Sequence, residues 1–226
     1  MELPSWVIVS LPVGALLAGV FFGWRYMRRG TSALHRAAAK GKVSRLEQFL
    51  LANPESVNRP DLVGFSPLQY AAIWGQVETA RLLLAYHAHL TNEKGLSPLH
   101  YAAAGGHEAV VHLLLEHGSD VNLCARGDGS TPLHSAVIHR RADMTRLLLE
   151  KGADSGAKTK SGWTACHFAA EKGDEATMIV LLEHQADWHA VNADQKSPLE
   201  LALDNGHRKI VELVRQFQNR QSAEGG

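Results

Sequence analysis

The stretch LSPLHYAAAGGHEAVVHLLLEHGSDVN, residues 96–122, decides the fold of this chain of 226 residues. It is the clearest copy of a unit that recurs at steps of 34, 31, 34, 33 and 33 residues. A fixed period near 33 residues, with an apolar run such as Leu-Leu-Leu late in the unit, predicts a solenoid of stacked helical units. The successive copies open with sequences related to Ser/Thr-Pro-Leu-His at Ser32 (a degenerate copy), Ser66, Ser97, Thr131, Thr164 and Ser197.

These openings and their spacing resemble ankyrin-repeat proteins, in six copies over about residues 30–220. The resemblance implies an all-α solenoid in which each unit has a hairpin-like loop followed by two antiparallel helices. In the third copy, Pro98 stands near the first helical position, where its missing N–H does no harm, and Gly118 is suited to end the second helix. Ankyrin repeats bind other proteins and rarely catalyse, so the resemblance implies an interaction module and not an enzyme.

Composition and motifs predict no chemistry of the chain's own. Lys plus Arg and Asp plus Glu both number 23, so the overall charge gives no case for nucleic acid. Cys124 and Cys166 stand in different copies without a Cys-x-x-Cys pair, which argues against a disulfide framework. The 13 histidines form no metal-ligand pattern, and we expect no metal, cofactor or catalytic residues. The histidines at the helix openings are expected to hydrogen-bond the nearby backbone, and they are His35, His100, His134 and His167.

Residues 6–24, WVIVSLPVGALLAGVFFGW, form a run of 19 residues without a charge. As a helix this run can just cross a hydrocarbon core of about 30 Å. Residues 25–29 follow with three arginines, which places this flank in the cytosol. We therefore expect a short non-cytosolic segment at 1–5, a single transmembrane helix at 6–24, a basic linker at 25–29 and a cytosolic array. The sequence does not choose between the endoplasmic reticulum, the plasma membrane and the mitochondrial outer membrane, and a cleaved signal peptide is the alternative interpretation.

Ala15, Gly19 and Gly23 recur every four residues in this run. Small residues at that spacing let two transmembrane helices approach closely, which predicts a homodimer or contact with another membrane protein. Ordinary glycine usage in a membrane span explains the pattern equally well.

In proteins that resemble this one, partners lie along a concave face built from hairpin tips and from the ends of the first helices. Exposed apolar clusters mark interaction surfaces, and tryptophan is enriched among their strongest contacts. The alternative is that Phe65 and Trp74 fill the space between neighbouring repeats. Carried onto this chain, the predicted partner-binding residues are Leu62, Phe65, Ile73, Trp74, Leu96, Ile138, His139 and Trp163.

Several copies depart from the pattern of the family. His87 and Gln185 replace the glycine that ends a helix, at a cost of about 1 kcal/mol if the backbone stays left-handed. Residues 126–129 include one extra loop residue, which predicts an altered hairpin. Charged residues on the first and last copies are expected to keep the ends of the array soluble, and residues 221–226 are expected to be disordered.

Together these features predict a membrane-anchored adaptor that binds a partner protein through the concave face of a cytosolic array. The alternative is a regulatory subunit of a membrane channel, transporter or enzyme that acts through its transmembrane helix. A secreted protein, cleaved after the apolar run, is the third hypothesis.

Overall fold

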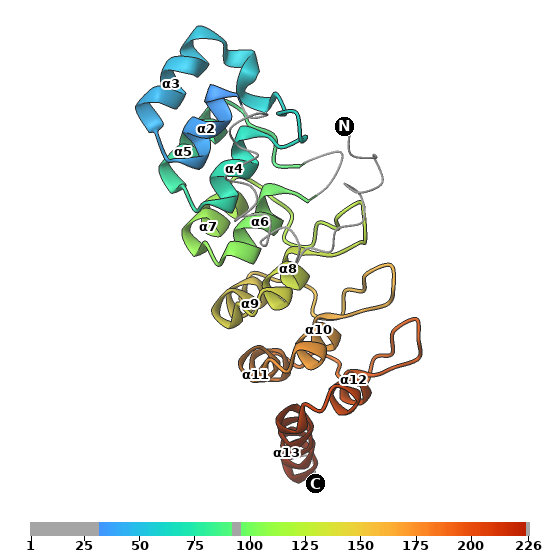
Figure 1. Cartoon of the computed structure of the whole chain (residues 1–226). Coiled ribbons are helices and arrows are strands. Elements are labelled where there is room, and N and C mark those ends of the chain that lie inside the picture. The colour runs from blue at the N-terminus through green and yellow to red at the C-terminus, as the bar shows by residue number, and fades with distance from the viewer. Residues whose placement is uncertain (1–31, 92–95, 225–226) are drawn as a thin grey trace. The chain divides into compact units, whose positions relative to one another are not determined.

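The structure, a computed structural model, describes residues 32–91 and 96–224, which fold as helices joined by turns and hairpin-like loops (Figure 1). The segments 1–5, 6–24 and 25–29, with Ala15, Gly19 and Gly23, lie outside the described residues. Within the described ranges no helix has the length and apolar character that a bilayer crossing needs. The described chain forms two compact units, which meet between Asp120 and Val121 in the sequence.

The N-terminal unit contains three helix pairs. The first helices α2, α4 and α6 pack side by side, and the second helices α3, α5 and α7 do the same. Alanines fill the contacts between first helices, and Ala71, Ala72, Ala102 and Ala103 are fully buried. The elements are α2 (Ala33–Ala39), α3 (Val43–Ala52), the 3-10 helix η2 (Pro54–Asn58), α4 (Pro67–Ile73), α5 (Val77–Ala85), α6 (Pro98–Gly105) and α7 (Glu108–Glu116).

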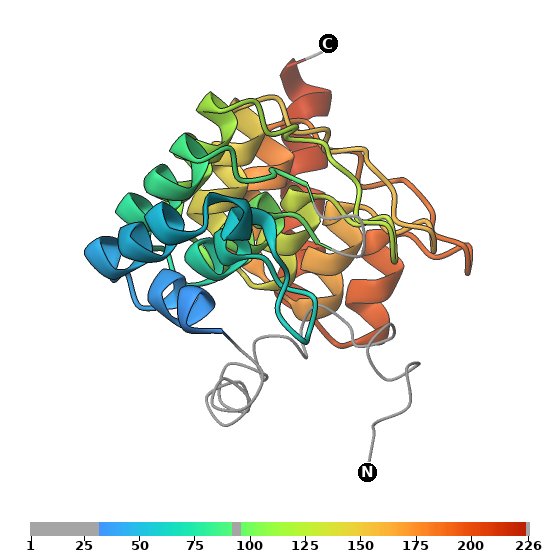
Figure 2. The same cartoon turned by 90° about the horizontal axis from the view of Figure 1, so that it is seen from above.

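The C-terminal unit repeats this arrangement, with α8, α10 and α12 in one row and α9, α11 and α13 in the other. Its hairpin loops project from one side of these helices (Figure 2). Disorder is expected from the sequence for residues 221–226, but the last helix continues through Glu224. The helix continues because this part of the sequence is rich in good helix formers. The elements are α8 (Pro132–Ile138), α9 (Ala142–Glu150), α10 (Ala165–Lys172), α11 (Glu175–Glu183), α12 (Pro198–Asp204) and α13 (Arg208–Glu224).

The repeated openings are helix caps. In the second repeat the hydroxyl of Ser66 accepts a hydrogen bond from the Gln69 N–H at 3.2 Å, while the Gln69 side chain accepts one from the Ser66 N–H at 2.8 Å. This reciprocal capping satisfies backbone donors that would otherwise lack partners at the start of a helix. The same box forms at four other repeat openings, Ser97, Thr131, Thr164 and Ser197.

Side chains at the end of the first helices join adjacent repeats. The His107 Nε2 lies 3.0 Å from the Ile73 carbonyl oxygen, and the His207 Nε2 lies 2.9 Å from that of Glu171. In the fourth repeat Arg140 reverses the direction, because its guanidinium donates forward to the Lys172 carbonyl. These bonds fix the spacing of the first helices within each unit.

The predicted departures from the family pattern are confirmed in the backbone. His87 and Gln185 have φ of 60° and 57°, in the left-handed region that glycine occupies at the same place in Gly118 and Gly152. The hairpin at residues 125–130 closes with an Ala125 N–H to Ser130 carbonyl bond across five residues. The other hairpins that the structure describes close across four residues, as between Asp61 and Phe65, so the extra residue widens this loop.

Candidate protein-binding surface

The hairpin of the second repeat is held by one carboxylate. Oδ1 of Asp61 accepts hydrogen bonds from the N–H groups of Val63 at 2.9 Å and Phe65 at 3.0 Å, and Oδ2 accepts one from the Tyr70 hydroxyl at 2.8 Å. The backbone N–H of Asp61 also donates a hydrogen bond to the Phe65 carbonyl oxygen, with an N···O distance of 2.9 Å. Bonds to a charged acceptor are stronger than neutral ones, so the loop has a fixed shape.

This fixed loop presents two apolar side chains to solvent. Leu62 is 85% exposed and Val63 is 44% exposed. Single exposed apolar residues are common on protein surfaces, but here two adjacent ones stand on a loop with little freedom to turn them inward. A rigid apolar tip loses little conformational entropy when a partner covers it.

Phe65 supports the tip from below and is half-buried. Its ring centroid lies 5.6 Å from that of Tyr70 and 5.6 Å from that of Tyr101, which belongs to the next repeat. Burial raises the pKa of both tyrosines, and the Asp61 carboxylate raises that of Tyr70 further. The phenols therefore stay neutral, and Phe65 acts mainly as a packing residue between repeats, as the alternative interpretation of the sequence proposed.

Ile73 and Trp74 stand at the end of α4 and are half-buried. The carbonyl of Ile73 is occupied by His107, as described above. The Trp74 Nε1 lies buried and has no hydrogen-bond acceptor among the described residues. A buried donor without an acceptor costs about 1–3 kcal/mol, and because this atom is closed to solvent, a partner reaches it only if the end of α4 rearranges.

Leu96 differs from the expectation that it extends an exposed patch, because its side chain is only 9% exposed. It stands directly before the capping residue of α6, the same place that Phe65 holds before α4. Its carbonyl accepts a hydrogen bond from the Gln69 Nε2 at 2.7 Å. This position ties a hairpin to the preceding repeat, so Leu96 belongs to the packing between repeats and not to the surface.

In the C-terminal unit, Trp163 holds the corresponding position and is half-buried. Its ring centroid lies 4.9 Å from that of Phe168 and 5.9 Å from that of His167. Ile138 and His139, at the end of α8, are also half-buried, and the His139 Nδ1 lies 2.8 Å from the Ser135 carbonyl oxygen. Trp163 thus combines a packing role with an exposed edge. Trp163 belongs to the C-terminal unit, whereas Leu62 and Trp74 belong to the N-terminal unit.

Sequence reasoning missed four exposed apolar residues, among them Ile179 on α11, which is 42% exposed. Leu51 on α3 and Leu203 on α12 are 68% and 54% exposed, and Val191 stands at the base of the last hairpin with 40% exposed. The helical pattern gave no signal for Leu51 and Leu203, because both continue apolar stretches that are buried elsewhere. No cluster of three or more His, Cys, Asp or Glu that could hold a metal ion is found in the described part of the chain.

Comparison with known proteins agrees with this geometry. A family model described as "Ankyrin repeats (3 copies)" matches residues 13–94, 85–159 and 151–221. The human DNA-binding protein RFXANK is 39% identical over 56 residues, covering 25% of this chain and 22% of that protein. Mouse RFXANK is 35% identical over 66 residues, with 25% of this chain and 24% of that protein covered.

A channel protein also shares the repeat. The Caenorhabditis elegans transient receptor potential cation channel subfamily A member 1 homolog is 47% identical over 49 residues, covering 22% of this chain and 4% of the channel. The chain therefore spans less than a quarter of each of these three relatives.

Proposed function

Because the chain belongs to the ankyrin-repeat family, we propose that it is a protein–protein interaction adaptor that captures a partner on the hairpin of its second repeat while residues 6–24 attach it to a membrane. Leu62 carries the proposal, since it is 85% exposed on a loop that Asp61 holds in place. Burying a leucine side chain fully stabilises a complex by about 1.5–3 kcal/mol.

The hairpin suggests what the partner offers. An apolar pocket that receives Leu62 and Val63 would dehydrate both side chains. We therefore propose an apolar partner surface, with Ile73 in the rim of the contact.

Substitution at the tip tests this assignment. Leu62→Asp should remove specific partners from a quantitative proximity-labelling experiment in cells, because a charged residue cannot enter an apolar pocket without losing its hydration. Val191→Asp is the matched control, since Val191 is an exposed apolar residue beside a hairpin of the other unit. Both variants should keep the circular dichroism spectrum and melting temperature of the parent. If the partners labelled by Leu62→Asp are those of the parent, the assignment of the surface is wrong.

Membrane attachment by residues 6–24 is the second part of the proposal, and it rests on the sequence. We expect the protein to resist carbonate extraction, and a C-terminal tag on intact membranes to be digested by protease from the cytosolic side. A carbonate-soluble protein protected inside vesicles would instead identify the apolar run as a signal peptide. The compartment follows from fractionation, with the endoplasmic reticulum, plasma membrane and mitochondrial outer membrane as the candidates.

The four-residue spacing of Ala15, Gly19 and Gly23 favours a second function, regulation of a membrane protein through the proposed transmembrane helix. Replacing Gly19 and Gly23 by leucine should then abolish co-purification with the regulated channel, transporter or enzyme, or with a second copy of the chain. Leu62→Asp should leave that interaction unchanged. The two sets of variants therefore separate capture at the hairpin from contact inside the membrane.

A further inference from the structure

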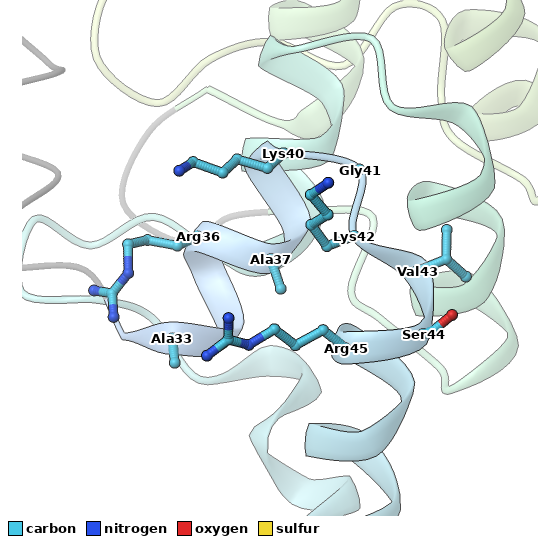
Figure 3. Close-up of a pocket in the computed structure, with 9 residues that line it drawn as sticks. All are labelled: Ala33, Arg36, Ala37, Lys40, Gly41, Lys42, Val43, Ser44 and Arg45. Carbon is cyan, nitrogen blue, oxygen red and sulfur yellow. The ribbon is translucent and has the colours of Figure 1, made fainter.

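The first repeat carries a concentrated positive charge. Residues 36–45, which contain the turn between α2 and α3, include four basic residues and no Asp or Glu. The side chains of Arg36, Lys40 and Arg45 extend to the same side of the turn (Figure 3). Together they border a pocket of about 620 Å³, lined by Ala33, Arg36, Ala37, Lys40, Gly41, Lys42, Val43, Ser44 and Arg45.

Three of these cations, Lys40, Lys42 and Arg45, form no ion pair with an acidic residue of the described chain. All three are exposed. Arg45 lies over the Phe49 ring at 5.8 Å, which holds its guanidinium near the turn. Lys40, Lys42 and Arg45 therefore keep their charge and their donors available for a ligand.

The same turn in the four middle repeats is built differently, whereas α13 of the last repeat, like α3, has no acidic residue in its first turn. An acidic residue stands in the first turn of each second helix from α5 to α11, where its negative charge interacts favourably with the positive end of the helix dipole. The first turn of α3 has no acidic residue and carries Arg45, which the dipole disfavours. The acidic residues of the other helices are Glu78, Glu108, Asp143 and Glu175.

This arrangement sacrifices local stability. The residue before α3 is Lys42, and its side chain caps no backbone group. Places where a local rule for stability is broken are often functional sites. An anion is the ligand that would reverse both disadvantages, since it pairs with the basic side chains and with the N–H groups at the start of a helix.

We propose that the basic surface, defined as Arg36, Lys40, Lys42 and Arg45, binds the anionic lipid headgroups of the membrane to which the chain is attached. This inference rests on the proposed function, because attachment through residues 6–24 brings the surface to the headgroups. Only eight residues, 25–32, separate the apolar run from α2, and they span at most about 30 Å. Anionic lipids attract basic groups within a Debye length of about 8 Å.

An anionic membrane fits these residues better than an acidic protein does. Two of the four cations are lysines, whose ammonium groups act as point charges on flexible stems, whereas recognition of a fixed carboxylate favours paired donors from arginine. The exposed apolar anchors found on the second hairpin have no counterpart among the nine lining residues. The site thus suits mobile headgroups held mainly by charge.

Lysine footprinting on the unmodified full-length chain tests the proposal. The protein is incubated with excess vesicles of phosphatidylcholine alone, or of phosphatidylcholine with phosphatidylserine, and its amines are acetylated and quantified by mass spectrometry. We expect the acetylation rates of Lys40 and Lys42 to fall about threefold or more with phosphatidylserine, and to recover at about 1 M salt, where screening shortens to about 3 Å. Lys151, exposed in the other unit, is the internal control and should react equally with both vesicles.

Equal acetylation of Lys40 and Lys42 in the two lipid mixtures would overturn the proposal and point to an acidic protein instead. Protection that survives high salt, or that Lys151 shares, would also overturn it. Membrane attachment is read separately, from flotation of the protein with neutral vesicles after a carbonate wash. If flotation fails while phosphatidylserine still protects the two lysines, the attachment is wrong and the basic surface stands.

Discussion

The Nε2 atom of His167 lies 3.1 Å from the carbonyl oxygen of Lys196, which closes the hairpin of the following repeat. The backbone N–H of Thr164 donates to Nδ1 of the same ring at 3.1 Å, so Nε2 carries the proton and donates to Lys196. His167 is fully buried. One ring therefore caps its own helix and fastens the next repeat.

Removing this ring should destabilise the C-terminal unit. We expect His167→Ala to lower the free energy of unfolding by about 2–4 kcal/mol, since it leaves buried groups unpaired and opens a cavity. His167→Gln should retain most of the stability, because Gln69 makes the same two contacts in the second repeat, accepting from Ser66 and donating to Leu96. Urea unfolding followed by circular dichroism measures both variants.

The exposed His89 supplies the control for this comparison. His89→Ala should change stability by no more than about 0.5 kcal/mol. Equal losses in His167→Ala and His167→Gln would show that the ring matters for its shape and not for its two hydrogen bonds.

Buried histidines also predict how stability depends on pH. Burial lowers the pKa of His35 and of His167 in the folded chain, while both titrate near 6.5 in the unfolded chain. The unfolded chain then binds protons that the folded chain does not, so stability is complete above pH 6.5 and falls as the pH drops below it. The loss is at most about 1.4 kcal/mol per pH unit for each histidine.

Urea midpoints measured between pH 7.5 and 5 check this slope. His167→Gln should unfold with a shallower dependence on pH, because glutamine does not titrate. A variant with the slope of the parent would contradict the assignment of His167 as a source of the acid sensitivity.

Much of the fold follows from the sequence because ankyrin units depend on local rules. The openings at Ser66 and Ser97 are reciprocal caps formed within four residues, and the extra residue before Ser130 lengthened the hairpin by one position, as predicted. Caps and turns involve residues only a few positions apart, so they can be recognised from the sequence alone.

The surface was harder to predict, because exposure depends on the neighbouring repeat. Leu96 and Phe65 hold the same place in the unit, and both pack between repeats. Leu96 contacts Gln69, about 27 positions away, and Phe65 contacts Tyr101, about 36 positions away. Leu62 and Val63 are exposed, since no later residue of the described chain covers them. Whether a partner covers them is the question for Leu62→Asp.

The two cysteines should differ in reactivity. Cys166 is fully buried in α10, and burial raises the pKa of its thiol to about 12, whereas Cys124 is exposed. Since the thiolate is the reactive form, Ellman's reagent at pH 8 should modify one thiol rapidly in the folded protein and both in urea. Cys124→Ser should abolish the rapid phase. Rapid release of two equivalents without urea would contradict the burial of Cys166.

Left-handed residues offer a gain in stability. Gln185 has φ of 57° after the end of α11, where two other repeats have glycine, Gly118 and Gly152. Gln185→Gly should raise stability by about 0.5–1 kcal/mol, because the strain of a side chain at positive φ exceeds the entropy that glycine adds to the unfolded chain. The melting temperature should rise accordingly.

Two further substitutions separate backbone strain from side-chain contacts. Gln185→Ala keeps a Cβ and should gain nothing, so an equal gain with alanine would attribute the effect to the glutamine side chain. Arg140, with φ of 56°, is equally left-handed, but its guanidinium donates to the Lys172 carbonyl of the next repeat. Arg140→Gly should therefore gain less than Gln185→Gly, or lose stability, since a hydrogen bond from a charged group contributes about 1.5–3 kcal/mol. The difference between the two glycine variants measures what the arginine bridge contributes to the stacking of the fourth and fifth repeats.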